Sequence, residues 1–199
     1  MAARKVQSYS GIRVRGRSLE LIELRAIQMR NLLKLPSGRL DPLNVAVRAE
    51  HAYPHLKTLR VTAERLAGDH ARAMVSPPRI LVDPRLVFEP AREAELRFAI
   101  LHELAHLVLH FDELIALQDR PPSRSSGYTE NSEWQANIMA AAVAAPIEMV
   151  VAAGSADELA ELSGLPRERV LFRYERAQQA SRHPLPILDY IESAASDQS

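Results

Sequence analysis

The amino-acid sequence predicts an α+β domain in which helices dominate and a small antiparallel sheet packs beside one buried helix. Three observations support this fold class. Aromatic residues are only 5% of the 199 residues, so the core must be built mainly from Ala, Leu, Val and Ile. Helical spacing of apolar residues recurs along the chain, while β-like runs are confined to residues 56–82. A long central segment is apolar on almost every face, which is typical of a helix buried inside a domain.

The N-terminal part divides into an arm and a first helix. Residues 1–17 are polar and rich in arginine without periodicity, so we expect a flexible arm. From Ser18 the spacing becomes helical, and the pattern stops at Pro36. The apolar stripe of this helix consists of Leu19, Ile22, Ala26 and Met29. We expect residues 18–146 to form the core domain.

A second helix and the small sheet come next. Asp41 before Pro42 indicates an N-cap followed by proline at the first helical position, and this helix is expected to run to about residue 53. Three short β-like runs follow, at residues 56–61, 71–75 and 79–82. We expect these runs to form the antiparallel sheet, with a pairing that the sequence leaves open.

Two longer helices are expected in the second half of the core. The first runs from about Ala91 to Phe111, contains neither Gly nor Pro, and is apolar on nearly all faces from Leu96 onward. A loop rich in Pro and Ser occupies residues 121–127. The second helix is rich in alanine and runs over about residues 130–145.

The C-terminal part is predicted to be helical as well. Shorter helices are expected at about residues 147–153, 156–163 and 166–180. We expect residues 147–182 to form a helical region packed on the core and residues 183–199 to form a tail.

Composition limits the kinds of site that the protein can carry. Positive and negative charges balance to zero, so no global field attracts nucleic acid or acidic lipid. The absence of cysteine excludes thiolate ligands, so any metal must be held by His, Asp or Glu. The basic N-terminus precedes no apolar stretch, and no apolar run is long enough to cross a bilayer. We therefore expect a soluble cytoplasmic protein without membrane contact.

The central helix carries a combination of residues that points to metal chemistry. His102 and His106 are four residues apart, so they lie on one face about one turn apart and can reach one zinc ion. The carboxylate of Glu103 can take a proton from a water that zinc activates and later deliver it to a leaving amine. Unpaired ionisable groups in so apolar a helix would be costly, which favours a metal site over two core histidines. This H-E-x-x-H spacing predicts a zinc peptidase.

The third zinc ligand is less obvious from the spacing. His110 continues the four-residue series, but it lies about 12 Å along a straight helix from His102. We therefore expect His110 to be structural or to hydrogen-bond a ligand. Asp112 and Glu113 are too close in sequence to fold back easily.

Glu133 is the best candidate for this third ligand. It begins the alanine-rich helix, whose face is lined with small residues, and small residues let two helices approach closely. Glu130 lies one turn earlier and is the alternative.

Two segments carry motifs that resemble those of a known family. Residues 97–110 read RFAILHELAHLVLH, and residues 133–146 read EWQANIMAAAVAAP. They resemble the motifs R-F-t-l-A-H-E-L-G-H-l-l-L-H and E-x-x-A-N-x-F-A-A-x-L-L-M-P of the ImmA/IrrE family of zinc metallopeptidases, and the resemblance covers about residues 19–182. The departures are Ala105 for the usual glycine, Met139 for phenylalanine, and alanines where Leu-Met precede the proline.

This resemblance implies both a site and a function. His102, His106 and Glu133 would be the zinc ligands, and Glu103 would be the catalytic base. The implied substrate is a helix-turn-helix transcriptional repressor, whose cleavage switches on stress or mobile-element genes. The alternative is a non-catalytic regulatory protein that binds a partner or DNA and holds a structural metal.

Other residues are candidates for supporting roles near the site. Tyr128 precedes the Glu133 helix and could donate to an oxyanion, although an ordinary loop tyrosine is the simpler interpretation. Asn137, like His110, is a candidate to hydrogen-bond a ligand or a substrate oxygen. Trp134 is adjacent to Glu133 but faces about 100° away, so we expect it to pack in the core.

Residues 158–174 have the helix-glycine-helix rhythm of a helix-turn-helix. DNA binding would present Arg167, Arg169 and Arg173 to phosphates and base edges. Neighbouring glutamates dilute this positive charge, and similar helices in the family commonly pack on the peptidase fold. We therefore favour packing on the core over DNA contact.

Overall fold

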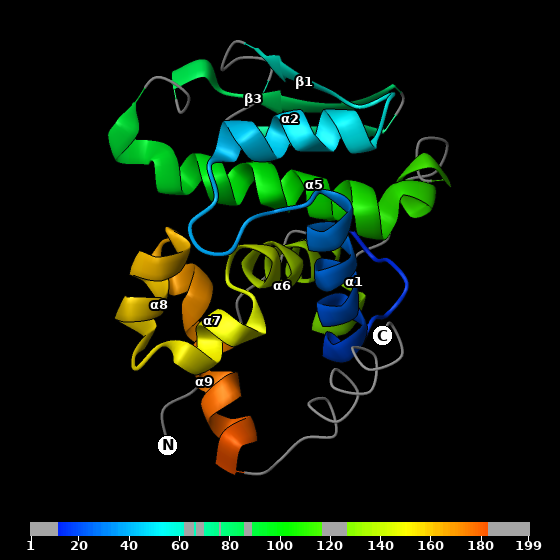
Figure 1. The fold of residues 1–199 in the computed structure, drawn as a ribbon. Coiled ribbons are helices and arrows are strands. Elements are labelled where there is room, and N and C mark those ends of the chain that lie inside the picture. Colours follow the sequence, from blue (N-terminus) through cyan, green and yellow to red (C-terminus); the bar gives the residue numbers. More distant parts are fainter. Residues whose placement is uncertain are drawn as a thin grey trace, which may run out of the picture.

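The computed structural model describes residues 12–61, 66, 70–75, 77–85, 89–116 and 127–182 of the chain. The long helix α5 (Glu93–Ala116) runs through the middle of the molecule (Figure 1). The small sheet and α2 (Pro42–Ala52) lie on one side of α5, and α1 (Leu19–Leu32), α6 (Ser132–Ala144) and the C-terminal helices lie on the other. The helix-dominated α+β fold that the sequence predicted is confirmed.

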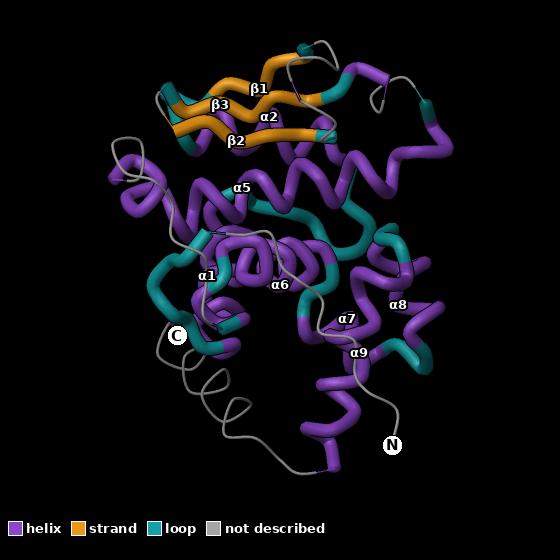
Figure 2. Tube along the Cα trace, turned by 180° about the vertical axis from the view of Figure 1, so that it is seen from behind, coloured by secondary structure: helices purple, strands orange, loops and turns teal. Residues whose placement is uncertain are grey.

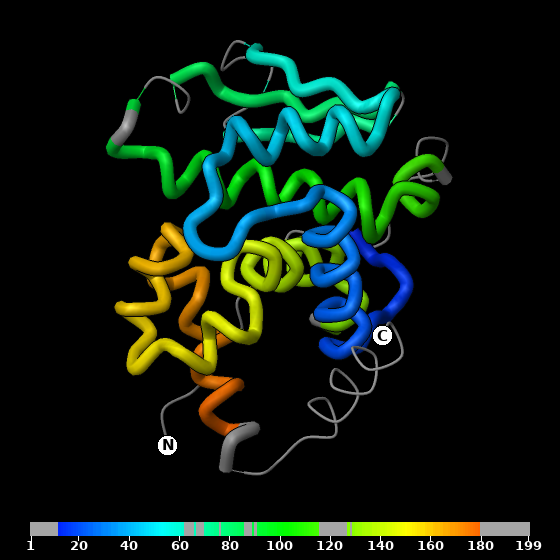
Figure 3. Tube along the Cα trace, in the orientation of Figure 1, coloured from blue at the N-terminus to red at the C-terminus, as the bar shows by residue number. Residues whose placement is uncertain are grey.

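The first two helices begin where the sequence indicated. The hydroxyl of Ser18 accepts a hydrogen bond from the Leu21 amide at 3.3 Å, and the carboxylate of Asp41 accepts one from the Asn44 amide at 2.6 Å. Three residues of the predicted apolar stripe of α1 are buried, namely Ile22, Ala26 and Met29. α1 packs against α6, so segments distant in sequence lie side by side (Figure 3).

The sheet has three strands in the order β1 (Lys57–Arg60), β3 (Pro78–Val82), β2 (Ala71–Val75), as Figure 2 shows from behind. β2 and β3 form an antiparallel hairpin, as expected. β1, however, runs parallel to β3, so the prediction of a wholly antiparallel sheet was wrong for this pair. The chain reverses direction twice between these strands, because β2 lies between them in sequence, and β1 and β3 therefore point the same way.

α5 is buried as its apolar composition predicted. It packs against β2 and β3 with one face and against α6 with the other. Leu104 and Ala105, in the middle of the motif, have no exposed surface. A short 3-10 turn, η1 (Pro90–Arg92), leads into the helix.

α6 lies against α5 with an alanine-rich surface. Ala136, Ala140 and Ala144 are fully buried, so no long side chain holds the two helix backbones apart. The 3-10 turn η2 (Tyr128–Glu130) precedes α6, and the side chain of Asn131 caps it by accepting a hydrogen bond from the Trp134 amide at 3.0 Å.

The C-terminal region consists of α7 (Ile147–Ala152), α8 (Ala156–Ser163) and α9 (Arg167–Arg182). Its packing on the core depends in part on Arg173, whose side chain is 9% exposed. The guanidinium donates to the carbonyl of Ala145 at 2.6 Å and forms an ion pair with Glu23. These contacts connect α9 to the end of α6 and to α1.

The N-terminal segment is held more tightly than its composition suggested. Of the predicted arm 1–17, residues 1–11 lie outside the described part of the structure, as do residues 117–126 and the predicted tail 183–199. Residues 12–17 lie against the core. The Val14 amide donates to the carbonyl of Glu130 at 2.9 Å, and the Val14 side chain is buried. A segment rich in arginine has no apolar periodicity, which is why this docking was not predicted.

Candidate metal centre

α5 presents His102 and His106 on the face that is turned toward α6. Their Nε2 atoms lie 3.0 Å apart, and the two rings meet edge to face with their centroids 4.6 Å apart. The spacing of four residues in a regular helix produces this arrangement. The side chains are 13% and 10% exposed, so both rings are largely shielded from solvent but remain accessible at one edge.

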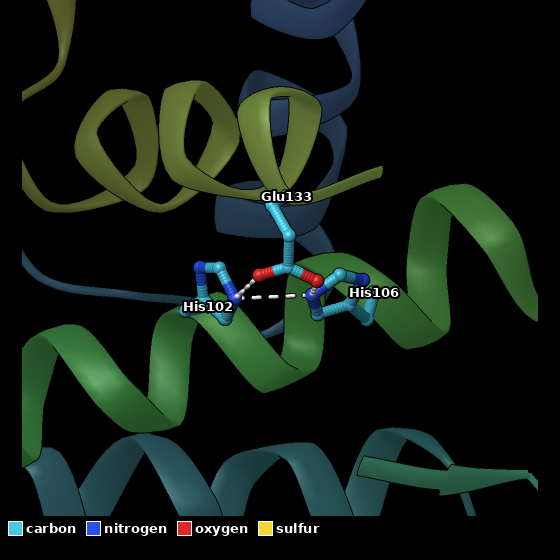
Figure 4. A group of neighbouring side chains, drawn as sticks. All are labelled: His102, His106 and Glu133. Carbon is cyan, nitrogen blue, oxygen red and sulfur yellow. Dashed lines mark hydrogen bonds and ion pairs between the residues drawn. The ribbon is translucent and has the colours of Figure 1, made fainter. Parts of the chain in front are cut away.

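Glu133 reaches the same point from the first turn of α6 (Figure 4). Its Oε2 lies 3.1 Å from Nε2 of His102, and its Oε1 lies 3.2 Å from Nε2 of His106. One potential ligand atom from each of the three residues falls within 4.8 Å of the other two. Asn131 determines where α6 starts, and the alanine surface determines how close it comes, so both features place Glu133 here.

The chemistry of this donor set fits a divalent metal ion of the zinc type. Two imidazole nitrogens and one carboxylate are the donors of a common three-ligand zinc site. With neutral rings, two Nε2 atoms that face each other at 3.0 Å need a proton or a cation between them, and a metal ion satisfies both lone pairs together. The ring of His102 is also packed against Phe98, with centroids 5.8 Å apart, which helps to orient it.

The pKa of the Glu133 carboxyl reflects this cluster. Burial by itself raises the pKa, but hydrogen bonds and charge from His102 and His106 outweigh it and hold the pKa well below its ordinary value. Glu133 is therefore an anion at neutral pH, as a metal ligand has to be.

Glu103 follows His102 on α5 and is turned toward the sheet. Its Oε2 accepts a hydrogen bond from the backbone amide of Ala73 in β2 at 2.5 Å. The strand thus orients the carboxylate that the sequence assigned as a base. The amide of Ala73 was not predicted, because a backbone donor has no sequence signature.

His110 lies one turn beyond His106 and is not among the grouped ligand atoms. It is fully buried, with its ring 5.6 Å from that of His106 between centroids. Burial, together with the nearby His106 and Arg17, lowers its pKa to about 3, so His110 is neutral at physiological pH. Nη1 of Arg17 lies 3.4 Å from Nδ1 of His110, a contact that was not predicted from the sequence.

The other carboxylates considered for the third ligand are engaged elsewhere or exposed. Glu130 forms an ion pair with Arg13 at 2.9 Å, and Glu113 forms one with Arg17 at 3.1 Å. Asp112 is exposed on α5. The structure therefore brings Glu133, and none of these three, to the histidine pair.

The remaining predicted site residues, Trp134, Asn137 and Tyr128, are not among the grouped ligand atoms. Trp134 is buried in the core, as expected. Asn137 is half-buried one turn after Glu133, and no hydrogen bond joins it to the three grouped residues. Tyr128 begins η2, but its side chain lies outside the described part of the structure.

Of the three arginines of the helix-turn-helix pattern, Arg173 is buried and Arg167 and Arg169 are exposed, but each of the three contacts another side chain of the protein. Arg173 is buried, and Arg167 pairs with Asp157 at 2.7 Å. The guanidinium of Arg169 lies over the ring of Phe98, 4.2 Å from its centroid. These contacts favour a packing role for α9 over DNA contact.

Comparison with known proteins places the site in a sequence family. The family model described as the IrrE N-terminal-like domain, a peptidase family, matches residues 51–174, which include all four residues of the predicted site. No curated protein matches the chain. None of the helices in the described ranges has the length and apolar character needed to span a membrane.

Proposed function

Because the chain belongs to the peptidase family of the IrrE N-terminal-like domain, we propose that it is a zinc-dependent endopeptidase. His102, His106 and Glu133 would hold the metal, and Glu103 would be the general base. The observation that carries this proposal is the convergence of two imidazoles and one carboxylate from α5 and α6.

Zinc in such a site lowers the pKa of a nearby water toward neutrality and polarises the carbonyl group of a peptide bond. The protein itself supplies a partly enclosed site, the carboxylate of Glu133 and the two imidazole nitrogens of His102 and His106. His102, His106 and Glu133 would be three protein ligands. A tetrahedral zinc site with three protein ligands has one coordination position left for water or substrate.

Glu103 would move the proton during hydrolysis. Its carboxylate would accept a proton from the attacking water and deliver it to the nitrogen of the leaving amine. The hydrogen bond from the Ala73 amide fixes the orientation of this carboxylate. A base that is held in place needs little rearrangement before the reaction, which lowers its entropic cost.

For the substrate, we propose a helix-turn-helix transcriptional repressor whose cleavage activates stress or mobile-element genes. The support is the likeness of both motifs to the ImmA/IrrE family.

The test combines a metal assay with a cleavage assay on the purified protein. The wild-type chain should hold about one zinc per molecule and cut a repressor encoded near its own gene. Glu103→Gln should retain zinc and lose cleavage. Glu95→Gln is the matched control, because Glu95 lies on the same helix but is exposed and paired with Arg92. Glu95→Gln should retain both properties.

Two results would contradict the proposal. Cleavage that persists in Glu103→Gln would show that Glu103 is not the general base. A wild-type protein that binds no zinc and cuts none of the neighbouring repressors would show that the chain is not a zinc peptidase acting on them.

A further inference from the structure

Arg17 joins the two helices that form the metal centre. Its side chain, which is 14% exposed, comes from the segment just before α1 and reaches the contact between α5 and α6. Among the described residues, its guanidinium contacts α5, Gln135 of α6 and the carbonyl of Arg15.

On the α5 side, Arg17 binds the turn that follows His106. Nη2 donates a hydrogen bond to the carbonyl of Leu109 and forms an ion pair with Glu113 at 3.1 Å. Nη1 lies 3.4 Å from Nδ1 of His110. A guanidinium has only donors, so Arg17 can hydrogen-bond Nδ1 of His110 only in the tautomer whose ring proton sits on Nε2. Two other acceptors, the Arg15 carbonyl and Oε1 of Gln135, lie closer to the same Nη1, each at 3.1 Å.

On the α6 side, Arg17 binds the first turn through Gln135. Nη1 donates to Oε1 of Gln135 at 3.1 Å. The amide nitrogen of Gln135 in turn donates to the carbonyl of Thr129 at 2.6 Å and to that of Arg15 at 2.9 Å. Gln135 is fully buried, and it stands two residues after Glu133.

These contacts form one partly buried polar network across the helix pair. One end fixes the α5 turn next to His106, and the other end fixes the turn of α6 that carries Glu133. We infer that Arg17 is a positioning residue for the metal centre, which holds the Glu133 carboxylate against the histidine pair and so raises the affinity for metal. The inference rests on the proposed metal site and not on the peptidase activity.

The network predicts a specific consequence for metal affinity. A buried polar network that loses one member leaves its partners unsatisfied, and the two helices can then shift relative to each other. Loss of a residue that orients metal ligands typically weakens metal binding by about 10- to 100-fold. We expect an effect of this size from Arg17→Met, which keeps the apolar stem and removes every donor.

The experiment measures the zinc Kd of the full chain by competition with a chromophoric chelator. The visible absorption spectrum of the cobalt(II)-loaded protein reports the ligand geometry, and the Tm of the metal-free protein reports stability. Arg173→Met is the matched control, because Arg173 is also a buried arginine that binds a helix-end carbonyl and a glutamate, away from the three ligands. It should lower Tm but leave the zinc Kd within about two-fold of wild type.

Arg17→Met should raise the zinc Kd by about 10-fold or more and change the cobalt spectrum. Arg17→Lys keeps a positive charge and should recover part of the affinity. If Arg17→Met does not fold, Gln135→Leu cuts the same network on the α6 side and should give the same change in Kd and spectrum.

Wild-type affinity with an unchanged cobalt spectrum in Arg17→Met or Gln135→Leu would overturn the inference. A Kd that rises equally in the Arg17 and Arg173 variants would also overturn it, since a general loss of stability would then explain both. A chain that shows Arg17-dependent zinc affinity but cuts no repressor would count against the peptidase and leave Arg17 as a positioning residue.

Discussion

Arg97, in the first half of α5, donates a hydrogen bond to the backbone carbonyl of Gly164 in the turn between α8 and α9. The guanidinium is fully buried and also contacts the carbonyl of Leu40 and the carboxylate of Glu93. One arginine on the metal-site helix therefore fixes both the chain that leads into α2 and the C-terminal region.

Gly164→Ala should destabilise the protein through this turn. Gly164 has φ of +66°, and an added Cβ would lie 2.6 Å from Nη1 of Arg97 and 2.7 Å from Nε of Arg39. We expect the free energy of unfolding, measured in urea, to fall by about 1–3 kcal/mol. Gly127→Ala is the control, because no atom of the described residues other than its chain neighbours lies within 4 Å of the corresponding position, and its effect should stay within about 0.5 kcal/mol. Equal losses in both variants would show that the turn has no special role.

Glu133→Ala should weaken zinc binding strongly, while Glu130→Ala should change it little. Glu133 lies 3.1 Å and 3.2 Å from the two histidine nitrogens, whereas Glu130 pairs with Arg13 at 2.9 Å. Glu133→Gln should fall between them, since an amide oxygen can contact zinc but carries no charge. Elemental analysis after gel filtration measures the difference. Full zinc content in Glu133→Ala would exclude this glutamate as a ligand.

His110 should make the protein less stable in acid. Its pKa is about 3 in the folded chain and 6.5 in a free side chain, so below pH 6.5 the unfolded state takes up a proton that the folded state does not. Stability is therefore lost as the pH falls from about 6.5 toward 3. Between pH 7 and pH 5, His110 should contribute a loss of about 2 kcal/mol.

Urea unfolding of the metal-free protein at these two pH values tests this expectation. His110→Gln cannot titrate and should show a correspondingly smaller loss between pH 7 and pH 5. The variant should also retain its zinc, because His110 does not belong to the group of ligand atoms. An unchanged pH dependence would mean that His110 is protonated in the folded state.

Local features of the structure could be predicted from the sequence. The caps at Ser18 and Asp41 depend on a side chain and an amide three residues later, so their signature is contained in a few adjacent positions. His102 and His106 are brought together by the helix itself. The prediction of Glu133 also required the packing of a second helix against α5. The small alanine residues of α6 indicated that the two helices could approach closely.

Contacts between distant segments could not be predicted in the same way. The partners of Arg17 on α5 and α6 lie 92 to 118 positions away, and nothing in the polar stretch around it distinguishes this arginine from its neighbours. The direction of β1 is equally nonlocal, because it depends on which edge of the β2–β3 hairpin the strand joins. The orientation of Glu103 depends on a backbone amide, which every residue of β2 other than a proline would offer.

Because α1 packs on α6, the segment that could be transferred between genes as a folding unit has to include α1. The sequence match to the family starts at residue 51, in the last turn of α2 and after the whole of α1. Yet Ile22 and Met29 of α1 belong to the same hydrophobic core as Met139 of α6, and Arg17 binds the turn that carries Glu133. A gene fragment that encoded only residues 51–174 would leave this side of α6 uncovered. The unit that recombination could move intact is therefore larger than the segment by which the family is recognised.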